Sequence, residues 1–512
     1  MKGLVAALIC LALLNVVMLP AAGAEASSGW GAEERLSVQH PTWVTDLEVD
    51  VSEGGQAIAA WDCYDSAEVR TSSWVAMYDP EKGWSDGSML DSASFSSYTQ
   101  NVEINANGMA MVAWARATGG FVYPMVAVYD AEEGWQEPVM LSTDQATHIY
   151  SMDVSLNDQG QAVVAWDATI GTSNDVLVSY YTPASGWGSA SHLIYSDKMQ
   201  SDTMVGIDDQ GGAVVVWRER VEVPGQPDRG QFRFSAYSNA TGWSAESTVN
   251  GEDVGLGSPS AHMDMDGQGR VLLAYGCRNT TSNSYDVHST YYNNSIWQPP
   301  VVLSREDGKE SNCPDVSLAK DGWGMVVWAG WNGSINEYQY REFDGGVFGP
   351  IGVIPQMPVD GMNWPYIDVS DGKQVIATTE VRLDGESVDH AYAVRYSPST
   401  GWSEWERLDK GSLTSVYFLV RGGVDREGRA VVAWISYDDA SNKDRSIWTS
   451  SYAVEAVEAE ISVDVEDTGA AEIQASVDDL RGQLTLAIAA AVAAMALAAI
   501  SLVLLIRKRR AE

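Results

Sequence analysis

The sequence predicts an all-β protein, an eight-bladed β-propeller built from four-stranded blades. Three observations support this prediction. A motif recurs about every 53 residues, each repeat contains four short strand-like segments, and a segment near the N-terminus resembles the strand that the last repeat lacks. Four-stranded units at this period are typical of propeller blades.

The repeat is marked by a Gly that precedes a Trp by six residues. The motif occurs as Gly55/Trp61, Gly108/Trp114, Gly160/Trp166, Gly211/Trp217, Gly322/Trp328 and Gly428/Trp434, with Gly269/Tyr275 and Gly372/Thr378 as degenerate copies. Successive sixth positions lie 53, 52, 51, 58, 53, 50 and 56 residues apart. Eight copies at such regular spacing predict eight structural units.

Each repeat has the pattern of four short strands. In the third repeat, an alternating segment at 152–156 precedes a continuous apolar run at 162–166, which indicates a strand covered on both faces. A third strand ends on an aromatic residue, here Tyr181, and a fourth begins at a Gly-Trp pair, here Trp187.

The last repeat stops after Tyr452 without a fourth strand, whereas residues 30–36 resemble 402–408. We therefore expect the N-terminal strand to complete the last blade and close the ring. A linear array would instead leave residues 30–36 as an unpaired edge and would expose apolar ends.

The repeats resemble those of extracellular β-propeller proteins, over residues 29–452. The turn before each Gly-Trp pair is similar in position to the Asp-box turn of the sialidase-like repeat class. These turns read Asp79-Pro80-Glu81-Lys82-Gly83-Trp84 or Ser397-Pro398-Ser399-Thr400-Gly401-Trp402, and the Asp-box motif Ser-x-Asp-x-Gly-x-Thr-Trp is absent. The resemblance supports the architecture and does not extend to sialidase activity.

The two ends of the chain predict export and membrane anchoring. Residues 1–24 combine Lys2, an apolar run and Ala22-Gly23-Ala24, the pattern of a signal peptide. Residues 484–506 carry no charge and are long enough to span a bilayer, and the basic tail 507–512 predicts a cytoplasmic C-terminus. Residues 25–452 would form the propeller outside the cell, and 453–483 an acidic stalk.

The composition excludes two classes of protein. A formal net charge of −39 disfavours a nucleic-acid binder, because phosphates would be repelled. With 45% hydrophobic and 10% aromatic residues, the chain is too apolar for a disordered acidic protein. A salty habitat or an acidic cell envelope is a competing explanation for the acidic surface.

The ligand face is expected on the long, irregular loops that follow the second strands and precede the first strands. Variable loops on a rigid scaffold are where function concentrates. The candidate residues are Asp62, Tyr64, Arg116, Asp167, Arg218, Arg220, Arg278, Trp331, Arg382, Tyr437 and Asp438. Such a rim suits a sugar or a partner loop, and ordinary solvated loop charge is the alternative interpretation.

Other chemistry-bearing patterns are sparse. Asp264 and Asp266 could bind Ca²⁺, although the same residues fit a tight turn, and no other cofactor is predicted. Cys277 and Cys313 are candidates for a disulfide that would leave Cys63 unpaired. Sequons begin at Asn239, Asn279, Asn293 and Asn332. No zinc, P-loop, Rossmann or Gly-x-Ser-x-Gly motif is present, and no glycosidase dyad can be singled out.

Two functions follow from these patterns. The first is a membrane-anchored binding or adhesion module for envelope glycans or protein partners. The alternative is a surface glycoside hydrolase or lyase with its site at the propeller mouth. Because fold alone does not decide between them, buried carboxylates with an Arg or Tyr at the mouth would favour the enzyme.

Overall fold

The computed structural model describes residues 29–36, 43–65, 70–93, 101–222, 229–255, 261–279, 284–305, 309–331, 336–357, 363–383, 387–410, 415–437 and 445–454. The chain divides into two compact units, 1–455 and 456–512, and all described residues belong to the first. Within these ranges every regular element is a β-strand.

The first four groups of strands follow one another along the chain. They are β3 (Trp43–Val51), β4 (Ala57–Asp65), β5 (Arg70–Asp79), β6 (Gly83–Trp84), β7 (Ser88–Ala93); β8 (Asn101–Ile104), β9 (Ala110–Thr118), β10 (Phe121–Asp130), β11 (Gly134–Trp135), β12 (Val139–Met140); β13 (Ala146–Leu156), β14 (Ala162–Ile170), β15 (Ser173–Thr182), β16 (Gly186–Trp187), β17 (Ser191–Ile194); and β18 (Gln200–Ile207), β19 (Ala213–Val221), β20 (Arg229–Ser238), β21 (Gly242–Trp243), β22 (Ser247–Gly255).

The remaining groups include the two N-terminal strands. They are β23 (Ala261–Met265), β24 (Val271–Asn279), β25 (Ser284–Asn293), β26 (Ile296–Trp297), β27 (Val301–Val302); β28 (Ser311–Leu318), β29 (Gly324–Trp331), β30 (Asn336–Asp344), β31 (Val347–Phe348), β32 (Gly352–Val353); β33 (Tyr366–Val369), β34 (Val375–Val381), β35 (His390–Ser397), β36 (Gly401–Trp402), β37 (Glu406–Arg407); and β38 (Val416–Val424), β39 (Ala430–Tyr437), β40 (Arg445–Ala453), β1 (Gly29–Trp30), β2 (Glu34–Leu36).

Each group is an antiparallel sheet in which the first, second and third strands pair in order. The predicted fourth strand is divided into two short pieces that both pair with the third strand, as β6 and β7 do with β5. Two groups, β8–β12 and β13–β17, also share one pair, Val122 with Ala146. The predicted four-strand repeat is therefore present as antiparallel four-strand sheets.

The first turn of each repeat requires a left-handed residue. Gly55 has φ +80° and its amide donates to the Ser52 carbonyl at 2.8 Å. In the seventh repeat the same turn is Ser370 to Gln374, and the left-handed residue is Lys373 (φ 56°). The predicted pair Gly372/Thr378 is thus wrong by one residue, since a non-Gly residue occupies the turn position there.

The core consists of second-strand side chains packed between neighbouring sheets. Six second-strand Trp residues are at most 1% exposed: Trp61, Trp114, Trp166, Trp217, Trp328 and Trp434. Trp114, for example, packs in one cluster with Ile58 and Val75 of the preceding sheet. Because each Trp joins two sheets, neighbouring repeats share one continuous core.

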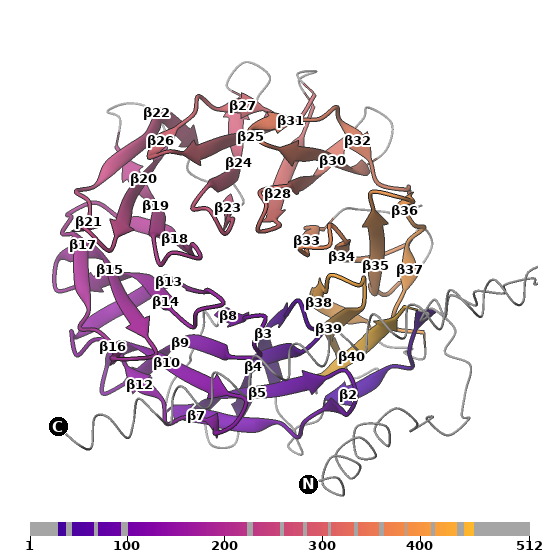
Figure 1. Ribbon diagram of the computed structural model, residues 1–512, viewed down its shortest axis with the longest axis horizontal. Coiled ribbons are helices and arrows are strands. Elements are labelled where there is room, and N and C mark those ends of the chain that lie inside the picture. Colours follow the sequence, from indigo (N-terminus) through magenta and orange to yellow (C-terminus); the bar gives the residue numbers. More distant parts are fainter. Residues whose placement is uncertain are drawn as a thin grey trace, which may run out of the picture. The chain divides into compact units, whose positions relative to one another are not determined.

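Neighbouring sheets also meet through their first strands. Each first strand contacts the next one in the series β3, β8, β13, β18, β23, β28, β33 and β38, and β38 in turn contacts β3. The N-terminal strands pair with the last strand, with Trp30 opposite Tyr452 and Glu34 opposite Thr449. Figure 1 shows the sheets of this unit side by side, with their first strands innermost. The described part is a propeller-type, all-β repeat protein, as predicted.

The segments predicted to export the chain and anchor it in a membrane lie outside the described residues. Residues 1–24, 484–506 and 507–512 are not among the described residues, nor is the stalk beyond Val454. Among the residues that are described, no helix has the length and apolarity to cross a membrane.

Candidate functional site

The first strands have one residue at each of two alternate positions, two and four residues before the turn, and all of these residues except Gly206, Met204 and Gly423 have a polar side chain. Nearest the turn these are Asp50, Glu103, Ser155, Gly206, Asp264, Ser317, Asp368 and Gly423; one step further they are Glu48, Asn101, Asp153, Met204, His262, Asp315, Tyr366 and Arg421. Residues of both sets from β8, β13, β18, β23 and β28 line a cavity of about 370 Å³, here called the central cavity. Because side chains alternate along a strand, both sets lie on one face.

Five of these carboxylates connect neighbouring sheets. Asp50, Asp153, Asp264, Asp315 and Asp368 each accept a backbone N–H from the first strand of the next sheet, at 2.7–2.8 Å. Four of them also accept the N–H of their own following residue. An inner edge strand has no further strand to pair with, so these carboxylates satisfy amides that would otherwise be unpaired.

In a second set of contacts, side chains of neighbouring sheets meet one another rather than backbone amides. Arg421 Nε donates to Glu48 Oε2 at 3.0 Å, and its guanidinium carbon lies 3.4 Å from the centre of the Tyr366 ring. His262 Nδ1 lies 2.5 Å from Asp315 Oδ1. Glu103 forms no hydrogen bond with any described residue. These groups combine a cation, a phenol, an imidazole and carboxylates.

Burial changes the acidity of these groups. It raises the pKa of Asp153 and Asp264 to about 7 and that of Asp50 to about 6, although backbone hydrogen bonds act in the opposite direction. Burial and neighbouring carboxylates raise the pKa of Glu103 well above its ordinary value. Burial lowers the pKa of His262, but the charge and hydrogen bond of Asp315 outweigh it and raise the pKa overall.

At the turn end of the first strands, ion pairs cross between sheets. Lys320 of the sixth repeat contacts Asp158 of the third repeat and lies 3.9 Å from Asp371 of the seventh. Arg426 lies 3.5 Å from Glu53 and 3.8 Å from Asp371. A second cavity of about 170 Å³ is lined by Glu53, Asp158 and Lys320, among others. We call this end the turn mouth; Glu53, Asp158, Lys320, Asp371 and Arg426 are paired there with one another.

At the opposite end, here the loop mouth, the first strands are irregular. Strands β3, β13, β18, β28 and β38 each have a register shift there. Three residues at the shifts have left-handed φ, namely Asp202 (52°), Cys313 (54°) and Leu419 (88°). Such a backbone is strained for a residue like Leu, and bulges and strain cluster near functional sites.

Exposed aromatic side chains also gather at the loop ends of strands. Among the described Trp, Tyr and Phe residues, the most exposed range from 39% (Trp331) to 71% (Tyr195); they are Trp43, Tyr150, Tyr195, Trp331 and Trp364. Each lies at, or within four residues of, the end of a strand that faces the long loops. The loop mouth thus has apolar surface that the turn mouth lacks among the described aromatic residues.

The residues predicted for the ligand face lie at this end but differ in exposure. Arg278, Trp331 and Arg382 are exposed, whereas Tyr64, Arg116, Arg218, Arg220 and Tyr437 are partly buried, and Asp438 is outside the described residues. Arg116 pairs with Asp91 at 2.7 Å and Arg218 with Asp202 at 2.9 Å. Several of the predicted cations therefore hold the scaffold together.

Two predicted ligand-face residues are instead buried within strands. Asp62 is 0% and Asp167 1% exposed. Asp62 accepts from Ser73 Oγ at 2.9 Å, and Asp167 accepts from Thr203 Oγ1 at 3.1 Å. The reason is that the second strands continue three or four residues beyond the Trp, so the residue after the Trp is not in a loop.

The predicted disulfide is not formed in the structure, where Cys63, Cys277 and Cys313 are all thiols. Cys277 packs with a cluster shared by the fourth and fifth repeats. Cys313 instead contacts Trp364 of the seventh repeat, and burial raises the pKa of its thiol to about 12. The two side chains face different sheet interfaces, which accounts for the missing bond.

The predicted calcium residues serve the first strand and its turn. Asp264 accepts the amides of Met265 and Leu318, while Asp266 accepts the Arg270 amide at 3.0 Å and also contacts its side chain. Within the described ranges, no group of three or more His, Cys, Asp or Glu side chains is arranged to hold a metal. The amide contacts of Asp266 agree with the turn interpretation, and calcium binding stays a prediction.

The sequons fall in different places. Asn239 is exposed on a turn, where its side chain donates to the Gln210 carbonyl at 3.0 Å, and Asn293 ends β25. Asn279 ends β24, and Asn332 is outside the described residues. Their use as glycan sites stays a prediction.

Sequence reasoning did not select Glu48, His262, Tyr366 and Arg421. The available signal was the repeated alternation, since these residues stand four positions before the turn in their repeats. These side chains belong to strands, whereas a ligand face is expected on loops.

Comparisons with known proteins give distant likenesses only. No protein-family model and no curated protein matches the chain. Solved structures that resemble it include the polysaccharide lyase Uly1 (10% identity, 83% of this chain, 99% of that chain, TM-score 0.44). A second is the β-propeller domain of the Trilobed protease from Pyrococcus furiosus (12% identity, 73% of this chain, 97% of that chain, TM-score 0.43). A third is the NanB sialidase from Streptococcus pneumoniae (10% identity, 78% of this chain, 84% of that chain, TM-score 0.37). These proteins are similar to the chain in overall structure and differ widely in sequence.

Proposed function

We propose that the described strands form an eight-bladed propeller closed by the N-terminal strands. The pairing of β1 and β2 with β40 and the contact between β38 and β3 support this closure. Replacing Trp30 and Leu36 together by Ala should lower the unfolding temperature as much as the same change at Trp402 and Leu408. An unchanged unfolding temperature would exclude closure.

The propeller acts as a binding module whose ligand face is the loop mouth. The observation that carries this proposal is the concentration of exposed Trp and Tyr side chains at one end of the strands. Exposed apolar surface on a soluble domain marks interaction sites, and aromatic residues are enriched in interfaces. The strained bulges at the same end are consistent with this role.

The favoured ligand is an envelope glycan, and a protein partner is the other ligand class. Flat aromatic rings stack on the apolar faces of sugar rings. The carboxylates of the central cavity lie below the loop mouth, so a polyanionic glycan would be repelled and an uncharged glycan preferred.

The test is binding of the purified full-length protein to a panel of neutral and acidic glycans. We expect binding to neutral members without turnover. Binding that survives unchanged in the double variant Tyr150→Ala, Trp364→Ala would refute the loop mouth as the site. If the protein binds no glycan but captures a defined surface protein, the ligand is a protein partner instead.

The second candidate function is a glycoside hydrolase or lyase. The observation in its favour is the set of Glu103, His262, Tyr366 and Arg421 near the central cavity, because carboxyls with raised pKa values can act as general acids. Turnover of a glycan that is lost in Glu103→Gln, without loss of binding, would support the enzyme. Five of the neighbouring carboxylates are occupied by backbone amides, and this favours the binding module.

The proposed cellular location of the propeller rests on the segments predicted at the two ends of the chain. A signal peptide at 1–24, an acidic stalk at 453–483 and a membrane span at 484–506 would present the propeller outside the cell, with residues 507–512 in the cytoplasm. Protease added to intact cells should release a propeller-sized fragment. Protection of the whole chain from such protease would contradict this topology.

A further inference from the structure

At the loop mouth, two aromatic side chains and an arginine meet where the last repeat contacts the first. Trp43 begins β3, Tyr437 ends β39 and Arg445 begins β40. The guanidinium carbon of Arg445 lies 5.4 Å from the centre of the Trp43 ring and 5.2 Å from the centre of the Tyr437 ring. Arg445 Nη1 also donates to the Val44 carbonyl at 3.4 Å. We call Trp43, Tyr437 and Arg445 the seam cluster.

The backbone that carries Trp43 is held by strand pairing and by the core. Trp43 lies opposite Tyr64 of β4, and the next residue, Val44, packs in a cluster with Ile435 and Ile447 of the last repeat. Successive side chains of a strand point to opposite faces, so the burial of Val44 leaves Trp43 outside this core. Trp43 is 47% exposed. Its ring is therefore accessible, although it belongs to a paired strand.

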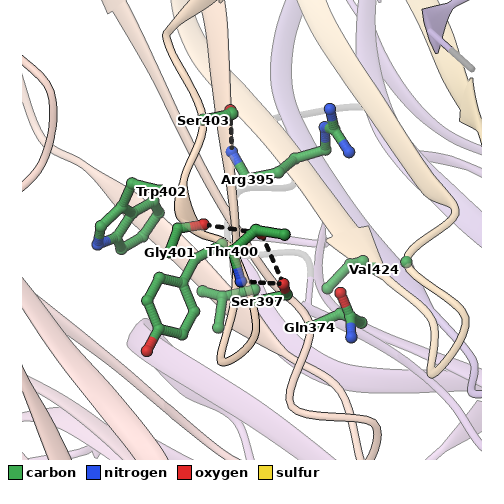
Figure 2. Close-up of a pocket in the computed structure, with 11 residues that line it drawn as sticks. Gln374, Arg395, Ser397, Thr400, Gly401, Trp402, Ser403 and Val424 are labelled. Carbon is green, nitrogen blue, oxygen red and sulfur yellow. Dashed lines mark hydrogen bonds between the residues drawn. The ribbon is translucent and has the colours of Figure 1, made fainter.

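Two other pairs of an Arg and a Tyr are more enclosed. Figure 2 shows Arg395 at the pocket of about 230 Å³ between the last two repeats. Its guanidinium carbon lies 3.4 Å from the centre of the Tyr452 ring, and Tyr452 is only 8% exposed. Arg421 lies at the same distance from Tyr366, which is partly buried. Packing between repeats accounts for these two pairs, but it does not account for an Arg held beside a ring that is nearly half exposed.

The surroundings of the seam cluster suit an uncharged sugar. A sugar ring has apolar faces, which stack on an indole, and hydroxyl groups around its edge, which both donate and accept hydrogen bonds. Thr45, which is exposed, and Tyr64, which lies opposite Trp43, supply hydroxyls in the same part of the mouth. An acidic sugar is disfavoured, because carboxylates line the central cavity and the chain has a net charge of −39.

We propose that the exposed part of the Trp43 ring stacks on one uncharged sugar ring of a glycan, and that Arg445 is a positioning residue that holds the indole in place. This inference rests on the glycan binding proposed for the loop mouth and names the point of that mouth at which a sugar is held.

The test is calorimetric titration of the full-length protein with cellohexaose, mannohexaose, xylohexaose and maltohexaose, and with hexagalacturonate as the acidic probe. Trp43→Ala should weaken binding of the neutral sugars about tenfold, and Trp43→Phe, which keeps a ring, should weaken it less. Arg445→Met should weaken binding about two- to fivefold, the effect of losing a cation–π contact at an exposed site. Arg445→Lys, which keeps the charge, should restore part of this loss.

The matched control is Arg395→Met, which removes the Arg of an enclosed pair and should leave sugar binding unchanged. Unfolding temperatures of all variants establish that each one folds. The inference is overturned if Trp43→Ala folds and binds as tightly as the parent protein, or if Arg395→Met weakens binding as much as Arg445→Met. Tighter binding of hexagalacturonate than of the neutral sugars would also overturn it.

Failure of this inference can be told apart from failure of the function proposed above. If the variant Tyr150→Ala, Trp364→Ala loses binding while Trp43→Ala keeps it in full, the loop mouth remains the ligand face and the seam cluster is excluded. If none of the neutral sugars binds the parent protein, both proposals fail.

Discussion

The two ends of the first strands differ in the surface that they present. At the turn mouth, short turns of one kind place Lys320 and Arg426 against Glu53, Asp158 and Asp371. At the loop mouth, the same strands bulge and leave aromatic rings exposed. One end of the strands completes its own interactions, whereas the other retains unfilled surface.

This difference indicates which residues of each repeat can vary from one repeat to the next. The turn end is constrained by a backbone that must reverse within a few residues, so its residues are repeated. The loop end has no such constraint, and its side chains can be selected for a ligand. Between the two ends, the carboxylates of the central cavity keep the sheets in register.

The largest expected effect comes from removing one of these carboxylates. Asp264→Ala leaves the amides of Met265 and Leu318 without their acceptor, which should cost about 2–4 kcal/mol of unfolding free energy. Asp264→Asn keeps an oxygen acceptor and should cost much less. Chemical denaturation measures both. Equal losses in the two variants would contradict the connecting role.

The next effect separates the two ends directly. Trp364 is 47% exposed at the loop mouth, and Trp→Ala changes at binding surfaces can cost more than 1 kcal/mol, so Trp364→Ala should weaken glycan binding about tenfold. Ile296→Ala is the matched control, because Ile296 is 62% exposed at the start of β26, at the other end. It should change neither binding nor the unfolding temperature. Similar losses of binding in both variants would remove the distinction between the ends.

A third prediction concerns pH and the central cavity. The folded pKa values of Asp153 and Asp264, about 7, lie above the unfolded value of about 3.9, so the native state binds protons that the unfolded state releases. This contribution to stability is complete below pH 4 and is lost as the pH rises toward 7. The unfolding temperature should therefore be higher at pH 5 than at pH 8.

Repulsion among the negative charges of a chain with net charge −39 would also lower the unfolding temperature as the pH rises. The variant Asp153→Asn, Asp264→Asn separates the two causes, since it removes these two buried carboxyls and leaves nearly all the surface charge. It should flatten the pH dependence. A dependence as steep as that of the parent protein would assign the effect to the surface.

The repeat could be predicted from the sequence because it is marked by particular residue types at a fixed spacing. The positive φ of Gly55 depends on its own turn, and Trp61 stands at a position that recurs along the chain, so residue type and spacing reveal both. The same reasoning failed at Asp62, because strand length depends on how far the partner strand continues. It also failed at Gly372, where Lys373 takes the conformation that Gly usually adopts.

The site was less predictable because its residues meet only in three dimensions. Arg421 and Glu48 are 373 positions apart, and their contact requires the last repeat to lie against the first. The orientation of Arg395 depends on Tyr452 in the neighbouring repeat. Neither relation leaves a signal in residue spacing, although the alternation of polar residues in the first strands was visible.

The smallest expected effect is at the turn mouth, where Lys320 spans three repeats to reach Asp158. Both side chains are partly exposed, and pairs of this kind contribute about 0–1 kcal/mol. Lys320→Met should therefore lower the unfolding temperature only slightly, by less at high salt than at low salt, and should leave ligand binding at the loop mouth unchanged. A double-mutant cycle with Asp158→Asn isolates the pair. A large loss of stability, or weaker glycan binding, would mean that the two mouths are coupled, and the contrast between a self-satisfied end and a ligand-binding end would then fail.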